Sequence, residues 1–151
     1  MNDAPTIHNR KARYDYDIED TLEAGLRLVG TEVKSLRAGN ANLRDAFCGE
    51  EGGEMYLYNA HIAPYQQADE HLNHDPRRDR KLLLHKREIR RWARNAEEPG
   101  VTIAPLKIYF RDGKAKVQIG LAKGRKKHDK RRAIKEREEQ RRMKQIEHEY
   151  R

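Results

Sequence analysis

Apolar and polar side chains alternate near the start of the chain in a way that predicts a β-strand. Tyr14, Tyr16 and Ile18 are separated by acidic residues, and a period of two places one set of side chains on a buried face. Apolar positions continue as far as Val29, and Gly25 interrupts them as a candidate β-bulge. We therefore expect a half-buried strand over this region.

Two segments show the helical period instead. Val33 and Leu36 recur three residues apart between Thr31, a typical helix cap, and Gly39, which can end a helix in the left-handed conformation. Residues 84–96 carry a narrow apolar stripe on an otherwise basic segment, and a Pro-Gly pair follows them. The sequence predicts a short helix at each place.

Two hairpins complete the predicted elements. The first spans residues 46–62 and turns at the acidic, glycine-containing segment 50–54, whereas the second spans residues 106–121 and turns at the Asp-Gly pair of segment 111–114. Residues 81–84 fit either a strand or the start of a helix. Short antiparallel strands with flanking helices predict a mainly β fold, and a small barrel of the oligonucleotide-binding (OB) type would remove exposed sheet edges. An open α+β sandwich is the alternative.

Charge and hydropathy divide the chain into two parts. The chain has 151 residues, a net charge of +8 and a mean hydropathy of −1.16. Residues 123–151 carry a net charge of +7, whereas residues 1–122 carry a net charge of only +1 and hold nearly all of the Leu, Ile, Val and Phe. We expect residues 1–122 to form the OB-type barrel domain. We expect residues 123–151 to form a basic tail that is disordered when free, because it cannot bury enough apolar surface to offset its ordering entropy.

The tail favours an anionic partner. A dense group of cationic side chains releases counterions when it meets phosphates, which drives nucleic-acid binding regardless of sequence. Residues 129–150 contain no Pro or Gly and many helix formers, so the tail can become helical against a phosphate-lined surface. An equally open interpretation is that the tail is solvated and serves only solubility. Binding to an anionic membrane is a weaker hypothesis, because the tail lacks an apolar face.

No pattern in the sequence indicates catalysis, a metal or a cofactor. Glycine motifs that bind phosphates or dinucleotides are missing. Cys48 is the single cysteine and fits a structural thiol, while His71 and His74 lack a clear third metal ligand. We therefore expect a non-enzyme without metal site or cofactor. Because the sequence shows neither the apolar core of a signal peptide nor a membrane-spanning stretch, we expect a cytoplasmic protein.

Two further basic patches lie in the body of the chain. The first is segment 9–13, which precedes two tyrosines, and the second joins the dense run 77–81 to the predicted second helix. Basic groups beside exposed aromatic rings suit RNA, whose phosphates supply affinity and whose bases stack. For Arg90 and Arg94 the simpler explanation of the positive charge is that they lie on the solvent-exposed polar face of an amphipathic helix.

Several collinear segments resemble one protein family. Their order and spacing hold from about Asn9 to Glu138, which is nearly the whole chain. The segments are NRKAR (9–13), LEAG (22–25), GTEVKSLRAG (30–39), YNAHIAPY (58–65), HDP (74–76), RKLLLHKREI (80–89), AKG (122–124) and HDKR (128–131). Together they resemble the SsrA-binding protein family, also called small protein B.

This resemblance implies a fold and a function. It implies an OB-type barrel with flanking helices that binds the tRNA-like domain of transfer-messenger RNA (tmRNA) and delivers this RNA to stalled bacterial ribosomes, one protein per RNA. In the family the protein stands in for the missing anticodon arm of a tRNA. The matching positions Asn9, Glu23 and Leu83 are tied to binding the tRNA-like domain. With neighbouring side chains they give the expected tmRNA-binding set: Asn9, Arg10, Lys11, Arg13, Glu23, Lys34, Arg37, Lys81 and Leu83.

The resemblance also implies a role for the tail. In the family the tail turns helical in the empty mRNA channel of the small ribosomal subunit, where it senses that no message fills the decoding centre. Gly124, Lys130 and Arg131 match the segment needed for peptide tagging, and His128 matches a side chain that can stack on a decoding-centre base. The expected ribosome-binding residues are Lys123, Gly124, Arg125, Lys126, Lys127, His128, Asp129, Lys130 and Arg131.

Glu23 allows two roles, because a carboxylate repels phosphate. It can accept hydrogen bonds from base amino groups or 2′-hydroxyls, or it can hold a neighbouring arginine in place. At the level of function, the alternative is a structural ribosomal or general single-strand RNA-binding protein. A nuclease that depends on His71 and His74 is a more remote alternative.

Overall fold

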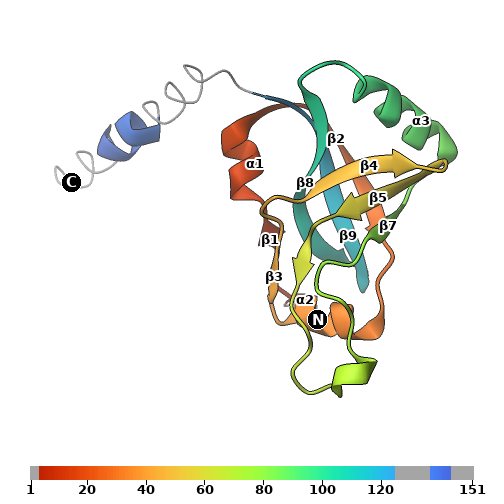
Figure 1. Cartoon of the computed structure of the whole chain (residues 1–151). Coiled ribbons are helices and arrows are strands. Elements are labelled where there is room, and N and C mark those ends of the chain that lie inside the picture. Colours follow the sequence, from red (N-terminus) through yellow and green to blue (C-terminus); the bar gives the residue numbers. More distant parts are fainter. Residues whose placement is uncertain (1–3, 125–136, 144–151) are drawn as a thin grey trace.

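The computed structural model describes residues 4–124 and 137–143 and consists mainly of antiparallel strands (Figure 1). Three helices flank the strands, and residues 137–143 form a further helical stretch. The elements in chain order are β1 (Ile7–His8), α1 (Arg10–Asp15), β2 (Tyr16–Leu26), α2 (Gly30–Arg37), β3 (Ala41–Asn42), β4 (Phe47–Glu51), β5 (Glu54–Tyr58), β6 (His61–Ile62), a 3₁₀ turn (Glu70–Leu72), β7 (Arg80–Leu83), α3 (Lys86–Asn95), β8 (Val101–Arg111) and β9 (Lys114–Gly124).

Six strands close into a barrel. They pair in the order β8, β4, β5, β7, β2 and β9, and β9 pairs back onto β8, while the short β1 adds to the outer side of β8. Every pairing is antiparallel. Closure leaves no long unpaired edge in the barrel. The expected mainly β fold with flanking helices is therefore confirmed, and the open sandwich is not formed.

The barrel interior holds the main hydrophobic core. Met55, Leu57, Leu82 and Ile119 have no exposed surface, and they come from three of the barrel strands, β5, β7 and β9. Alternate residues of these strands point inward because side chains in a strand have a period of two. Trp92 of α3 packs against the same core, so this helix covers one end of the barrel (Figure 1).

Helix α1 covers the outer face of β8 and β9, and the alternation in the sequence did not predict it. Asn9 caps the helix, because its Oδ1 accepts the backbone N–H of Ala12 at 3.1 Å. Ala12 packs on a small cluster that contains Ala104 and Ala122. Tyr14 therefore lies in a helix, and the predicted strand begins only at Tyr16.

The expected bulge in β2 lies elsewhere. The pairing with β9 shifts between Ile18 and Asp20, whereas Gly25 stays in regular register opposite Leu83 and Lys116. Glycine fits there for a different reason. A Cβ atom at this position would lie 3.1 Å from the Cβ of Leu83, so the glycine admits a close neighbour rather than a bulge.

The two predicted helices form with adjusted ends. Gly39 follows α2 with a φ of +78°, as expected for the end of a helix. Thr31 is not the cap, since Val29 occupies that position and the backbone N–H of Val29 donates to Glu32. The predicted second helix corresponds to α3, and residues 81–84, which the sequence left undecided, lie mainly in β7.

Both predicted hairpins are present as β4–β5 and β8–β9. Strand β9 continues two residues past the expected domain boundary at residue 122, so Lys123 and Gly124 belong to the barrel wall. The segment 129–150 is expected to be disordered when free and helical against an anionic surface. Residues 137–143 of it are already helical in this structure, and the remainder lies outside the described residues. No helix in the described part of the chain is long and apolar enough to cross a membrane.

Candidate nucleic-acid interface

Three of the expected tmRNA-binding residues lie together in one open groove of about 550 Å³, here called the barrel groove. Glu23 of β2 and Lys81 and Leu83 of β7 line it, together with Lys116 of β9 and the first turn of α3. Leu83 is 53% exposed although it is a large apolar side chain. Its position opposite Gly25 in the ladder leaves room for it at the surface.

Glu23, which lines this groove, also holds two side chains of β8. The hydroxyl of Tyr109 donates to Glu23 Oε2 at 2.5 Å, and Arg111 donates to the same oxygen at 3.1 Å. The Tyr109 hydrogen bond, together with Arg111, lowers the pKa of Glu23. Burial and this hydrogen bond raise the pKa of Tyr109 to about 12. The geometry favours the holding role of Glu23 over a direct contact with bases.

The other expected residues near the N-terminus have two different environments. Arg10, Lys11 and Arg13 are exposed on α1, and Lys11 forms an ion pair of 2.7 Å with Asp45. Asn9 is buried, and its Nδ2 donates to the carbonyl oxygen of Pro105 at 2.8 Å in addition to the cap described above. Asn9 thus positions the basic helix and does not itself face solvent.

Lys34 and Arg37 are exposed on α2 and lie over aromatic rings. The Lys34 ammonium lies 5.2 Å from the ring centre of Tyr65, and the Arg37 guanidinium lies 4.4 Å from that of Phe110. Cation–π contacts of this kind orient the charged groups without removing them from water.

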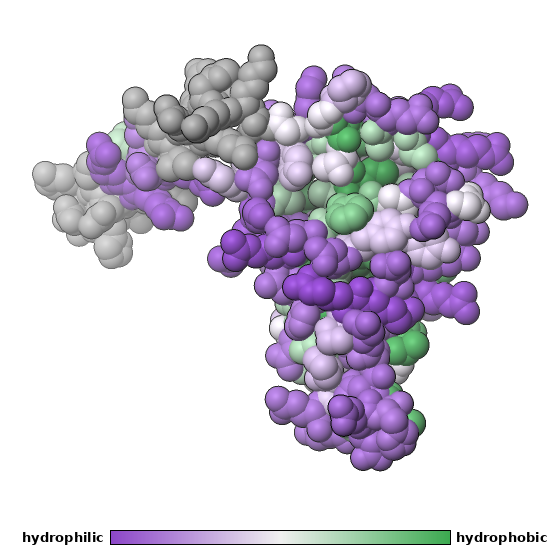
Figure 2. Space-filling view, viewed as in Figure 1, coloured by the Kyte–Doolittle hydropathy of each residue, from purple (hydrophilic) through white to green (hydrophobic). Residues whose placement is uncertain are grey.

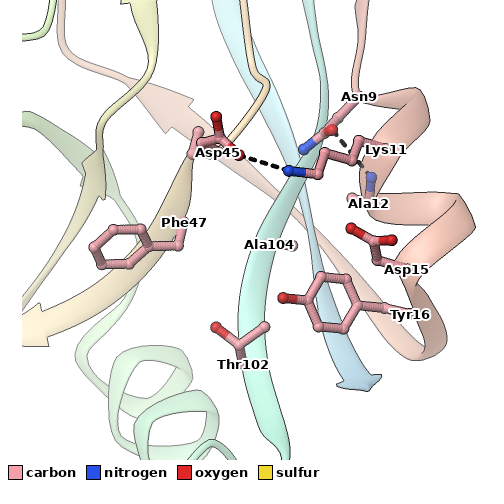
Figure 3. A pocket seen from close by; sticks show the side chains of 10 residues that line it. Asn9, Lys11, Ala12, Asp15, Tyr16, Asp45, Phe47, Thr102 and Ala104 are labelled. Carbon is pink, nitrogen blue, oxygen red and sulfur yellow. Dashed lines mark hydrogen bonds and ion pairs between the residues drawn. The ribbon is translucent and has the colours of Figure 1, made fainter. Parts of the chain in front are cut away.

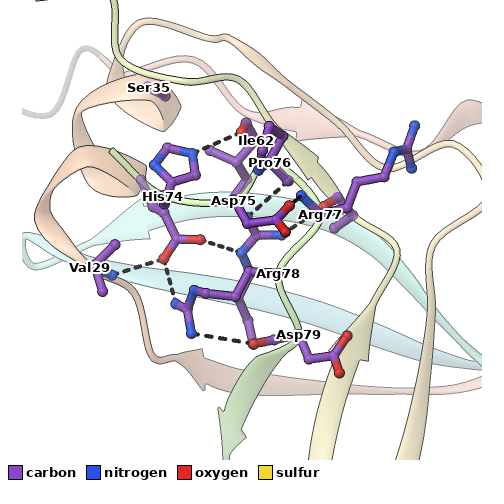
Figure 4. A network of polar contacts seen from close by, with 12 residues as sticks. Val29, Ser35, Ile62, His74, Asp75, Pro76, Arg77, Arg78 and Asp79 are labelled. Carbon is purple, nitrogen blue, oxygen red and sulfur yellow. Dashed lines mark hydrogen bonds and ion pairs between the residues drawn. The ribbon is translucent and has the colours of Figure 1, made fainter. Parts of the chain in front are cut away.

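The dense basic run 77–81 does not form one RNA-facing patch. Arg80 is fully buried and donates to Glu32 at 2.5 Å, while Arg78 donates to the second Glu32 oxygen at 2.5 Å (Figure 4). Arg77 donates to Asn59. The structure therefore assigns most of this run to a network that joins α2 to the loop before β7, and only Lys81 turns toward the barrel groove. Sequence reasoning missed the network because nothing local marks Glu32 as its centre.

His74 also belongs to this network. Its Nε2 donates to the carbonyl oxygen of Ile62 at 2.9 Å, and its Nδ1 hydrogen-bonds the hydroxyl of Thr31 at 2.8 Å. Within residues 4–124 and 137–143, no group of three potential ligands could hold a metal ion. Of the expected ribosome-binding residues, Lys123 and Gly124 end β9, and 125–131 lie outside the described residues.

Comparison with known proteins agrees with this arrangement. A model of the SmpB protein family matches residues 6–149. The SsrA-binding protein of Rhodospirillum rubrum is 60% identical over 131 residues, which cover 86% of this chain and 82% of that protein. The chain belongs to the SmpB family. The SsrA-binding protein of Staphylococcus saprophyticus is 56% identical over 133 residues, covering 88% of this chain and 86% of the relative.

A solved structure supports the same assignment for the fold. A chain described under "tmRNA-SmpB: a journey to the center of the bacterial ribosome" superimposes with a TM-score of 0.71 and is 51% identical. The match covers 87% of this chain and 95% of that chain. Because it includes most of the barrel, this SmpB family member has the fold of a relative that was studied together with tmRNA.

Proposed function

We propose that this protein binds the tRNA-like domain of tmRNA and delivers that RNA to stalled ribosomes for trans-translation. The observation that carries the proposal is the SmpB family match over residues 6–149, together with curated relatives named SsrA-binding protein at 56–60% identity. The exposed Leu83 gives the barrel groove an apolar contact for RNA, and Glu23 holds a polar ring and a cation, those of Tyr109 and Arg111, beside the groove.

The two parts of the chain divide the work in this proposal. The barrel domain binds tmRNA by shape and by a local set of side chains, since its net charge is close to neutral. The basic tail reaches the decoding centre and the mRNA channel of the small subunit, where phosphates neutralise its charge and complete its helix. The helical residues 137–143 support this role, because they provide a segment from which the helix can extend.

Catalysis is not part of this function. The protein acts in the cytoplasm as one copy per tmRNA, and it takes the place of the missing anticodon arm of a tRNA. Membership of an RNA-binding family supports a non-enzymatic role.

A competition experiment tests the first half of the proposal. The full chain is bound to labelled tmRNA and challenged with ordinary tRNA, and we expect tRNA to compete only at much higher concentration. Equal competition by tRNA would indicate a general RNA-binding protein. A pull-down from a bacterial lysate with sequencing of the retained RNA gives an independent answer, in which tmRNA should be strongly enriched.

Truncation tests the second half. The chain should be cut after Gly124, because β9 pairs as far as this residue and its N–H donates to the carbonyl oxygen of Gly100 at 3.0 Å. We expect the truncated protein to keep its affinity for tmRNA and to lose peptide tagging on stalled ribosomes. Loss of tmRNA binding and tagging together would contradict the division of work.

A further inference from the structure

A second concave site lies on the barrel, between α1 and the start of β4, and is here called the aromatic cleft (Figure 3). Its volume is about 340 Å³, which is in the range of sites for nucleotide-sized ligands. Phe47 and Tyr16 lie on opposite sides of the cleft, with Ala104 and Thr102 of β8 between them. Lys11 lies at one end. The aromatic cleft shares no residue with the barrel groove.

The ring of Phe47 is exposed and packs against a second aromatic ring. Phe47 is 47% exposed, and its ring centre lies 5.3 Å from that of Tyr58 at an angle of 32°. The hydroxyl of Tyr58 donates to Glu51 at 2.8 Å, which holds the supporting ring in place. Figure 2 shows less hydrophilic surface over β4 and β5 with hydrophilic side chains around it. An ordered aromatic face that meets water is suited to stacking, because little entropy is lost when a planar ligand binds.

The backbone beside Phe47 is held in an uncommon conformation. Asp45 and Asn59 have φ angles of 66° and 61°, in the left-handed region that Asp and Asn adopt more readily than other residues with a side chain. The Asn59 amide donates to the carbonyl oxygen of Asp45 at 3.1 Å, and Asp45 pairs with Lys11 across the end of the cleft. The Lys11 ammonium gives one donor to Asp45 and has others for a phosphate.

The position of the cleft indicates which ligand reaches it. Tyr16 is paired with Gly124, the last residue of β9, so the basic tail starts at the wall of the cleft. The exposed cations Arg10 and Arg13 lie on the adjoining α1. With a tail of net charge +7, this end of the barrel is complementary to a polyanion with planar bases, which is RNA.

We infer that the aromatic cleft receives one unstacked base of the ribosomal RNA along which the tail lies. The base stacks on Phe47, Tyr16 closes the opposite wall, and Lys11 contacts an adjoining phosphate. This inference rests on the proposed function and adds to it a second, base-specific contact on the folded domain. The base comes from the ribosome rather than from tmRNA, because the cleft lies where the tail begins and not in the barrel groove.

A first experiment tests whether the cleft takes a base. The chain has only two phenylalanines, and Phe110 lies under Arg37, so it serves as an internal reference. The full chain is labelled with ¹³C in its phenylalanine rings and titrated with pentaadenylate RNA. We expect the ring resonances of Phe47 to move upfield while those of Phe110 stay in place. Absence of any shift at Phe47, or equal shifts of both rings, would overturn the inference.

A second experiment tests the source of the base with the variant Phe47→Leu and the control Phe47→Tyr. Leu keeps the apolar character of an exposed site without a stacking face, and Tyr keeps the ring. One stacked base is worth about 1–3 kcal/mol, so Phe47→Leu should weaken binding to small ribosomal subunits by about 5-fold or more. Phe47→Tyr should bind as the wild type does. Both variants should bind the isolated tRNA-like domain unchanged and unfold at the wild-type temperature.

The outcomes separate this inference from the proposed function. Unchanged binding of Phe47→Leu to the subunits, or an equal loss with Phe47→Tyr, refutes the stacked base. A loss confined to the tRNA-like domain refutes its ribosomal source. Failure of the wild-type protein to prefer the tRNA-like domain over tRNA would instead refute the proposed function.

Discussion

Replacing Glu32 by Gln should destabilise the fold more than any change at the surface. Glu32 has no exposed surface, and its carboxylate accepts hydrogen bonds from Arg78, Arg80 and the backbone N–H of Val29. Arg80 is also fully buried. In Glu32→Gln the buried guanidinium loses its counter-charge. The NH₂ group of the glutamine amide is itself a donor, and it replaces a carboxylate oxygen that accepts hydrogen bonds in the wild type.

The expected decrease in the free energy of unfolding can be estimated from other buried ion pairs. Removal of one partner of a buried ion pair costs about 3–5 kcal/mol. Gln keeps one oxygen acceptor, and Arg80 also donates to the carbonyl oxygens of Ala60 and Pro76, so we expect the lower end, about 3 kcal/mol. For a chain of this size that corresponds to a fall in melting temperature of roughly 10 °C. Urea and thermal unfolding measure the change, and Glu97→Gln, at an exposed position, is the matched control.

The pH dependence provides a second check on the same interaction. Burial by itself would raise the pKa of Glu32, but hydrogen bonds from Arg78, Val29 and Arg80 lower it below its ordinary value of 4.5. A carboxyl group with a lowered pKa contributes its full stability above the unfolded value and loses it as the pH falls through the folded value. The difference between wild type and Glu32→Gln should therefore be constant above about pH 5 and shrink in acid. A difference in unfolding free energy below about 1 kcal/mol at neutral pH, or a difference that grows in acid, would refute the reasoning.

Changes or reactions at three single residues, Cys48, Gly120 and Tyr109, test other parts of the structure. Burial raises the pKa of the Cys48 thiol far above its ordinary value, so a thiol reagent at pH 8 should label the protein only in urea, and rapid labelling of the folded chain would contradict the burial. Gly120→Ala places a Cβ 2.8 Å from Leu106 Cδ1 and should lower the free energy of unfolding in urea by about 1–3 kcal/mol. Gly53→Asn, at an exposed turn position with no atom within 4 Å of the added Cβ, is the control and should leave this free energy nearly unchanged. Tyr109→Phe removes the hydroxyl that donates to Glu23 and should weaken tmRNA binding by about 5-fold in a filter assay, whereas unchanged affinity would show that the tyrosine does not shape the groove.

The sequence by itself determined the local structure and the division of charge. Period-two alternation and turn residues predicted the β4–β5 and β8–β9 hairpins, because a turn and its two strands are neighbours in the chain. Spacing of apolar residues predicted α2 and α3 for the same reason. The contrast between the nearly neutral residues 1–122 and the basic residues 123–151 also needs no coordinates. The resemblance of collinear segments to one family was likewise present in the sequence and was confirmed by the family match.

Only the tertiary structure decided which side chains act together. Glu23 and Tyr109 are 86 residues apart, and Glu32 and Arg80 are 48 residues apart. Their contacts depend on the closure of the barrel and on the register of its strands, which no local pattern encodes. The same basic run therefore contains Arg80, which stabilises the interior, and Lys81, which faces the groove, because neighbours in a strand point to opposite sides.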